Sequence, residues 1–388
     1  MIELLILLLP VAAASGWYVA MRSNKHRSSM QSGSLSAHYF KGLNYLLNEQ
    51  PDKAIEVFIE MLEVDSETVE THLALGNLFR RRGEVDRAIR IHQNIIARPT
   101  LSRGQRALAL YELGQDYMRA GLLDRAENLF LELLEIGEYS NQALKQLIEI
   151  YEQERDWENA IEIARKIEFA TGNSRNTDIA HYHCELADKA LRKNDIASAE
   201  SQVKKSLSVD SNCVRASILS GKIAAKNNDY QSAINAYKQV EKQDPDFISE
   251  VIELVNDCTQ DDRQKTAFMQ YLQHVTDNYG GITPMLMLAA LTREQNGEQE
   301  AEAFIVEQLR KRPSVRGLGK LIEYHMSHTQ GAARDNLLIL KSLITDLLDD
   351  RPVYKCNVCG FEGKVMHWHC PTCKRWSTVR PIQGVVGE

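Results

Sequence analysis

The sequence predicts an all-α protein: a superhelical solenoid of helical hairpins with an N-terminal transmembrane helix and a small C-terminal metal-binding ribbon. Three observations in the 388 residues predict this fold: an alanine that recurs about every 34 residues, an apolar stretch at the amino end and a cluster of four cysteines near the carboxyl end. Apolar residues make up 44% and charged residues 26% of the chain, a globular balance that excludes a disordered chain and a polytopic membrane protein.

The amino end predicts a membrane anchor at residues 1–21. Between residues 2 and 21 the only charged residue is Glu3, and these residues would span ~30 Å as a helix, the thickness of a bilayer's hydrocarbon core. The positive charges of Arg22, Lys25 and Arg27 follow the apolar stretch, so the positive-inside rule places the amino terminus outside and the rest of the chain in the cytoplasm. A cleaved signal peptide is the alternative. The serine-rich residues 22–36 predict a flexible linker.

A repeat fills residues 37–350. Its marker alanines follow one another at spacings of 34, 38, 34, 39, 34, 34 and 34 residues, at positions 54, 88, 126, 160, 199, 233, 267 and 301. A small or apolar residue precedes each alanine by twelve positions, as Gly76 and Gly114 do, and a mostly bulky residue follows it by four, as Phe130 does. The pattern resembles the tetratricopeptide repeat, so we expect about eight helical hairpins in which small residues face small residues. Residues 315–348 keep the helical period and predict a degenerate ninth hairpin that caps the stack.

Such an array is expected to act as a scaffold without an active site, because helical solenoids present a long concave groove that suits a peptide or a helix. The resemblance to the repeat assigns five residues of copies two and three to this groove: Asn77, Arg80, Arg81, Gln115 and Arg119. Together they would form a basic patch for an acidic partner segment, although surface arginines are commonly only solvated. The sequence shows no catalytic motif, so we expect the protein not to be an enzyme.

Residues 351–388 carry the clearest chemistry. Cys356 and Cys359 form one C-x2-C pair, and Cys370 and Cys373 form a second pair, with ten residues between the two pairs. Four thiolates suit a closed tetrahedral Zn²⁺ site, which predicts a structural metal and not a hydrolytic one. The paired knuckles resemble rubredoxin, so bound iron and electron transfer are the rival hypothesis.

The tail is also basic in an acidic protein. It holds six Lys or Arg against two Glu, a charge of +4, within a total of −7, so the rest of the chain carries −11. This charge, together with Trp368 and Trp376, leaves open an RNA- or ribosome-associated scaffold, or an anionic membrane surface near the tail. Nucleic-acid binding by the whole chain is not expected at this net charge. His181 and Cys184, on one face of a predicted helix, are assigned to ordinary packing.

The order of these modules is similar to one known family. The amino-terminal MIELLILLLPVAAA, the segment from Gly76 to His92 and the tail from Trp368 to Thr378 resemble the lipopolysaccharide assembly protein B family of Gram-negative bacteria. The resemblance implies a single-pass inner-membrane adaptor, with a periplasmic amino terminus and a rubredoxin-like zinc ribbon whose ligands are the four tail cysteines. It also implies, as partners, an FtsH-type membrane AAA+ protease, the committed-step deacetylase of lipid A synthesis and other inner-membrane lipopolysaccharide assembly or regulatory proteins.

Overall fold

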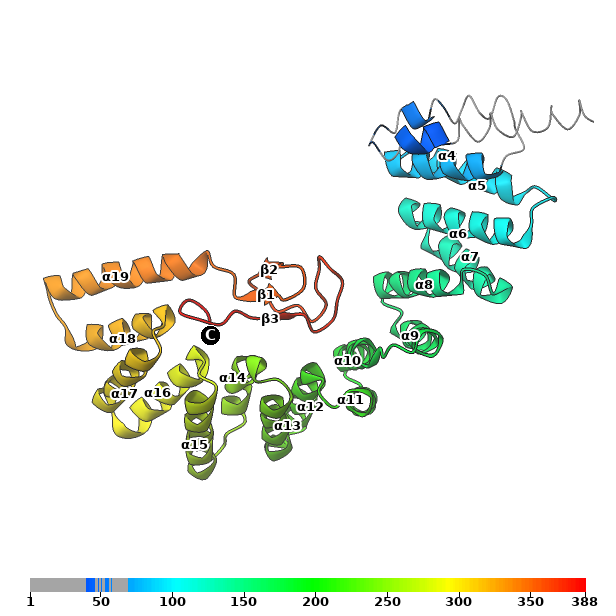
Figure 1. The fold of residues 1–388 in the computed structure, drawn as a ribbon. Helices are drawn as coiled ribbons and strands as arrows, with labels where there is room; N and C mark the ends of the chain where they lie inside the picture. The colour runs from blue at the N-terminus through cyan, green and yellow to red at the C-terminus, as the bar shows by residue number, and fades with distance from the viewer. Residues whose placement is uncertain (1–39, 46–47, 49, 51–52, 56, 58–68) are drawn as a thin grey trace, which may run out of the picture. The chain divides into compact units, whose positions relative to one another are not determined.

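The computed structural model describes residues 40–45, 48, 50, 53–55, 57 and 69–388 (Figure 1). The chain forms two compact units, the first ending at Glu154 and the second running from Arg155 to Glu388. The predicted anchor at 1–21 and the predicted linker at 22–36 lie outside the described residues. Within the described part of the chain, no helix combines the length and the apolar character that a bilayer crossing requires.

The first unit contains hairpins at the positions of repeat copies two and three and the first helix of copy four. Its helices are α4 (Val69–Arg82), α5 (Val85–Ile96), α6 (Arg103–Ala120), α7 (Leu123–Ile136) and α8 (Ser140–Glu154). Consecutive helices pack on one another, and α4 also contacts α6. The first helices of copies two and three therefore lie in one row, as the predicted solenoid requires.

The second unit by itself has the same kind of arrangement. Its helices are α9 (Trp157–Thr171), α10 (Asn176–Arg192), α11 (Ile196–Val209), α12 (Val214–Lys226), α13 (Tyr230–Gln243), the 3-10 helix η1 (Pro245–Phe247), α14 (Ser249–Asp257), α15 (Asp262–Asn278), α16 (Ile282–Asn296), α17 (Glu298–Lys311), α18 (Val315–His328) and α19 (Ala332–Asp349). The first helices of successive copies again touch, α10 with α12, α14 with α16 and α16 with α18. The all-α repeat fold is therefore confirmed.

The turns inside the hairpins follow from local sequence. Asn194 and Asn228 adopt left-handed backbone conformations, with φ of 61° and 60°, and each is followed by an aspartate that caps the next helix. Asp195 and Asp229 accept hydrogen bonds from the backbone N–H groups of the residues three positions on. Asparagine tolerates the left-handed region and aspartate is a favoured N-cap, so these pairs end one helix and start the next.

In the hairpins of copies three and six the core differs from the expected small-on-small contact. A Cβ on Gly114 would lie 2.6 Å from the Phe130 ring, and one on Gly221 would lie 2.2 Å from the Tyr237 ring. In these two hairpins the glycine of the first helix therefore faces the bulky residue of the second helix, and the expected small-on-small contact was wrong there. The physical reason is space, because a large ring can lie between two close helices only where the facing position has no side chain.

The marker alanines are fully buried with one exception. Ala267 is exposed, whereas its neighbour Phe268 is buried together with Leu272 and Val275. In copy seven the buried face of α15 is thus shifted by one residue. The regular spacing of Ala267 was misleading there.

The predicted ninth hairpin exists as α18 and α19, which pack together. It does not have the polar outer face of a cap, however. No residue of α19 is buried, and leucines on its surface remain exposed. The hairpin is thus the last of the described stack, with an apolar outer face.

The chain ends in a three-stranded antiparallel sheet of order β2-β1-β3, formed by β1 (Tyr354–Cys356), β2 (Glu362–Gly363) and β3 (Val379–Pro381). Its own core is small and centres on Cys356, Cys370 and Val379. We refer to residues 351–388 as the ribbon. A module of this size usually needs a metal or another staple to fold.

Candidate metal centre and its docking surface

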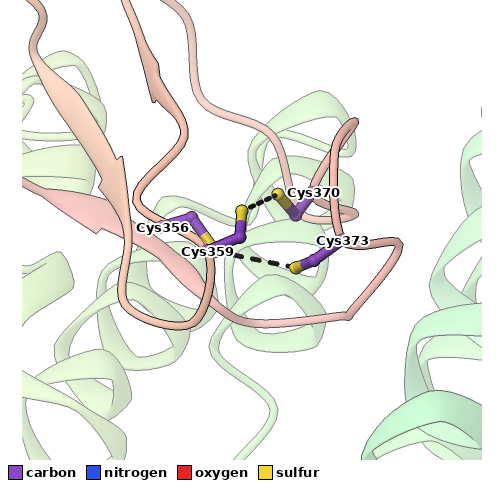
Figure 2. A group of neighbouring side chains, drawn as sticks. All are labelled: Cys356, Cys359, Cys370 and Cys373. Carbon is purple, nitrogen blue, oxygen red and sulfur yellow. Dashed lines mark hydrogen bonds between the residues drawn. The ribbon is translucent and has the colours of Figure 1, made fainter. Parts of the chain in front are cut away.

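The structure brings the four tail cysteines together (Figure 2). The Sγ atoms of Cys356 and Cys373 are 3.8 Å apart, those of Cys359 and Cys370 are 3.6 Å apart, and all four lie within 4.8 Å of one another. Four sulfurs about 2.3 Å from a central ion in a tetrahedron would be about 3.8 Å apart. The residues therefore fit a tetrahedral ion of the size of zinc or iron, with no coordination position left for substrate.

Two tight turns produce this convergence. The N–H of Gly360 donates to the carbonyl of Cys356, and the N–H of Lys374 donates to the carbonyl of Cys370, each at 3.0 Å. Gly360 and Lys374 both adopt positive φ, at 75° and 54°. The left-handed residue after each pair turns the chain back, so both thiols of a pair point to the same side.

The local environment gives the buried thiols of Cys356 and Cys370 different pKa values. Burial raises the pKa of Cys356, but hydrogen bonds with Thr378 Oγ1 and with the backbone N–H groups of Cys359 and Val358 outweigh it and lower the pKa to about 6. Burial raises the pKa of Cys370 to about 11. Only thiolates ligate metal, so metal binding must release a proton from Cys370 at neutral pH, and metal affinity is expected to fall as pH falls.

The ribbon packs against the helices of its own unit, and Trp376 is the centre of this contact. Its side chain is only 6% exposed. The rings of His369 and of His181 on α10 stack on it, with centroid distances of 4.3 Å and 5.0 Å, and Trp157 and Tyr182 meet it edge-on. His181 Nε2 also lies 2.7 Å from Ser377 Oγ. Burial lowers the pKa of His181 to about 3, helped by Arg215 and His369, so this ring is neutral at physiological pH.

A second contact lies further along the same row of helices. Trp368 stacks on Phe247 of η1 with a centroid distance of 5.4 Å and an interplanar angle of 22°. Arg380 pairs with Asp244 at 2.8 Å and with Asp246 at 2.6 Å. Trp368 and Arg380 of the tail are thus both used in contacts within the unit.

The last residues fasten the ribbon at a third place. The side-chain carboxylate of Glu388 accepts hydrogen bonds from Thr283 of α16, at 3.1 Å from its N–H and 2.7 Å from its hydroxyl, and from Arg316 of α18 at 2.5 Å. Tyr354 donates to Glu250 of α14 at 2.8 Å. The ribbon therefore contacts the first helices of copies five, seven, eight and nine, and Figure 1 shows it inside the arc of the second unit's helices.

The sequence did not identify this docking surface. His181 was assigned to ordinary packing, and the structure places it in the contact with the ribbon. A signal was available in the tail itself, since a module of 38 residues has little core of its own in which to bury the two large rings of Trp368 and Trp376. Two tryptophans in so small a module predict a partner surface.

One of the predicted groove residues of the first unit, Arg80, is already paired within the unit. Arg80 of α4 pairs with Glu112 at 2.6 Å and with Asp116 at 2.9 Å, both on α6. Its charge is thus neutralised within the unit, and Asp116 also contacts the buried His92. The carboxylates come from the next copy, more than thirty positions away, which is why repeat positions alone did not show the pairing.

The other four predicted groove residues differ in how accessible they are. Asn77 and Gln115 are half-buried, and Gln115 donates to the Tyr111 hydroxyl at 3.4 Å. Arg81 and Arg119 are exposed near the ends of their helices. Of the predicted groove residues, Arg81 and Arg119 are therefore the cations whose side chains are exposed.

These features define a class: a tetratricopeptide-repeat scaffold with a rubredoxin-like module that could bind a metal. Sequence comparisons agree. Residues 354–381 match the rubredoxin metal binding domain, residues 71–107, 111–174 and 184–246 match tetratricopeptide repeat families, and residues 44–65 match the PPR repeat. A scaffold of this class serves protein–protein interaction.

Full-length relatives identify the family. Lipopolysaccharide assembly protein B of Escherichia coli strain K12 is 39% identical over 388 residues, which covers 100% of both chains. The protein of that name from Haemophilus influenzae is 35% identical over 392 positions, which covers 98% of each chain. The chain belongs to the lipopolysaccharide assembly protein B family.

Proposed function

We propose that the protein is an adaptor of lipopolysaccharide synthesis that performs no reaction itself. It holds the committed-step deacetylase of lipid A synthesis close to an FtsH-type membrane protease and so promotes degradation of the deacetylase. The names of the relatives support a role in lipopolysaccharide assembly, and the repeat scaffold supports a role in protein binding.

One observation carries the assignment of the partner groove. In the second unit the first helices, which in helical solenoids line the concave groove, are occupied by the chain's own ribbon: Trp376 contacts α10, Tyr354 contacts α14, and Glu388 contacts α16 and α18. We therefore assign the groove for a partner peptide to the first helices of the first unit, α4 and α6. There Arg81 and Arg119 would attract acidic residues of the partner.

The anchor at residues 1–21 gives the adaptor its place in the inner membrane, with the repeat array in the cytoplasm. A membrane protease and a soluble substrate meet rarely. An adaptor tethered beside the protease turns this encounter into an intramolecular one, at an effective concentration that reaches the millimolar range. Other inner-membrane lipopolysaccharide assembly proteins are candidate regulators of the same complex.

We propose Zn²⁺ as the metal of the ribbon, in a structural role. The four-thiolate set supports it, because it leaves no open position for chemistry. Iron fits the same sulfur distances, so metal analysis of protein purified without added zinc decides between a structural site and an electron-transfer site. An RNA-binding ribbon is less favoured, since Trp376 is buried and Arg380 is paired with two aspartates.

The test is degradation of the deacetylase by the protease in reconstituted vesicles, with the full chain added. Replacing Arg81 and Arg119 together by Glu should slow degradation about tenfold or more. Replacing Arg90 and Arg125 by Glu makes the same charge change on the second helices α5 and α7, and it should have little effect. If both pairs slow degradation equally, the groove assignment is wrong. If removal of residues 1–21 leaves degradation unchanged, the tethering mechanism is wrong.

A further inference from the structure

The outer face of α19 is apolar and solvent-exposed. Ile339, Leu340, Leu343 and Leu347 are 59%, 49%, 58% and 46% exposed. At 3.6 residues per turn these side chains form one stripe along the helix, which we call the α19 stripe. A different set of residues faces α18, since Ile344 approaches Gly319 and Lys341 pairs with Glu323.

The shape that fits this stripe is another helix. The stack grows throughout the second unit by laying one helix on the apolar face of the previous one, and α19 is its last helix. With 18 residues α19 is about 27 Å long. A helix of about five turns would continue the packing over its whole length, in the manner of helix-in-groove recognition.

The charges beside the stripe restrict which charged side chains the partner helix can have. Asp335, Asp346 and Asp350 are exposed and follow one edge of the stripe at helical spacing. Residues 332–350 hold four aspartates against Arg334 and Lys341, a net charge of −2, and Lys341 is already paired. An anionic bilayer surface would be repelled by this edge.

A second copy of the chain is also disfavoured. Two α19 helices packed antiparallel about a two-fold axis bring the same edge of each helix together, so aspartates would face aspartates along the seam. Like charges that face each other destabilise such a pair. A helix with lysine or arginine beside its leucines has no such conflict.

We propose that the α19 stripe is a docking site for an amphipathic helix of another protein, with a leucine-type stripe flanked by Lys or Arg. This site is separate from the peptide groove assigned to the first unit, and it does not depend on which partner occupies that groove. The complex would extend the repeat stack by one helix and cover the leucines of α19.

Two synthetic 18-residue helical peptides with the same leucine stripe, one flanked by Lys and one by Glu, test the proposal by fluorescence anisotropy with the full chain. The Lys peptide should bind about tenfold tighter than the Glu peptide at low salt, because its lysines can pair with the three exposed aspartates beside the stripe. This preference should shrink as the salt concentration rises. Replacing Leu343 and Leu347 together by Ser should weaken the Lys peptide at least tenfold. Leu338→Ser is the matched control, because Leu338 is 47% exposed on α19 but lies outside the stripe.

In cells, a photo-crosslinker at residue 343 should capture a Lys- or Arg-bearing amphipathic segment of another protein, mapped by mass spectrometry, and one at residue 338 should not. Equal binding of the two peptides, or an equal loss in Leu338→Ser, would overturn the proposal. Crosslinks to α19 of a second copy, together with a dimer that the Leu343 and Leu347 replacements dissociate, would show self-association instead. Stripe-dependent binding to phosphatidylglycerol vesicles would show a membrane contact instead.

Discussion

Replacing His181 by Ala should weaken the docking of the ribbon on the array without unfolding the helices. The side chain contributes one stacked ring pair with Trp376, about 0.5–1.5 kcal/mol, and one hydrogen bond with Ser377, about 0.5–1.5 kcal/mol. The sum, roughly 1–3 kcal/mol, is a roughly 5- to 150-fold shift of the docking equilibrium. Hydrogen exchange of residues 366–381, measured by mass spectrometry in the metal-loaded protein, should accelerate by that factor.

His183→Ala is the matched control for this experiment. His183 lies on the same helix, is also buried, and makes one side-chain hydrogen bond, at 2.8 Å to Gln202. Its loss should destabilise the array to a similar extent but leave exchange in the ribbon unchanged. Equal acceleration in both variants, or none in His181→Ala, would refute the idea that the aromatic contact holds the ribbon in place.

Three further predictions concern the core, the metal and pH. Gly114→Ala should destabilise the first unit by about 1–3 kcal/mol in thermal denaturation, because its Cβ would lie 2.6 Å from Phe130, whereas Gly104→Ala, with nothing within 4 Å, should cost nothing; equal effects would contradict the packing argument. Cys356→Ser should abolish stoichiometric metal in elemental analysis and make the ribbon protease-sensitive with the helical circular dichroism retained, and Cys258→Ala should do neither. Because burial lowers the pKa of His181 from 6.5 to about 3, the unfolded chain binds a proton at mildly acidic pH that the folded chain does not. The free energy of unfolding should therefore be unaffected by this group above pH 6.5 and should be about 2 kcal/mol lower at pH 5. A denaturant titration in which His181→Gln shows the same acid sensitivity would disprove this.

The sequence was sufficient where a single local pattern determines the structure. The alanine spacing located the hairpins, and the two C-x2-C pairs located four sulfurs that the structure brings within 4.8 Å. The sequence was not sufficient where two distant segments of the chain meet. Repeat positions assigned Arg80 to a partner site and could not show its carboxylate partners, because these lie in the next copy. The alanine spacing assigned Ala267 to the core and could not show that the buried face of α15 is shifted by one position. The contact of His181 with Ser377 joins residues 196 positions apart, which no periodicity reports.

The same contacts indicate how the metal would act on the array. A ligand shifts an equilibrium only by its difference in affinity for the two states. Trp368 and Trp376, which contact the helices, lie close in sequence to Cys370 and Cys373 and bracket them. The metal would therefore favour docking through the backbone, by fixing both tryptophans in the positions that η1 and α10 require, and its removal would cost the entropy of ordering that loop again. A metal-free ribbon should then dock more weakly, and the lost affinity should return if the loop is restrained by another covalent link.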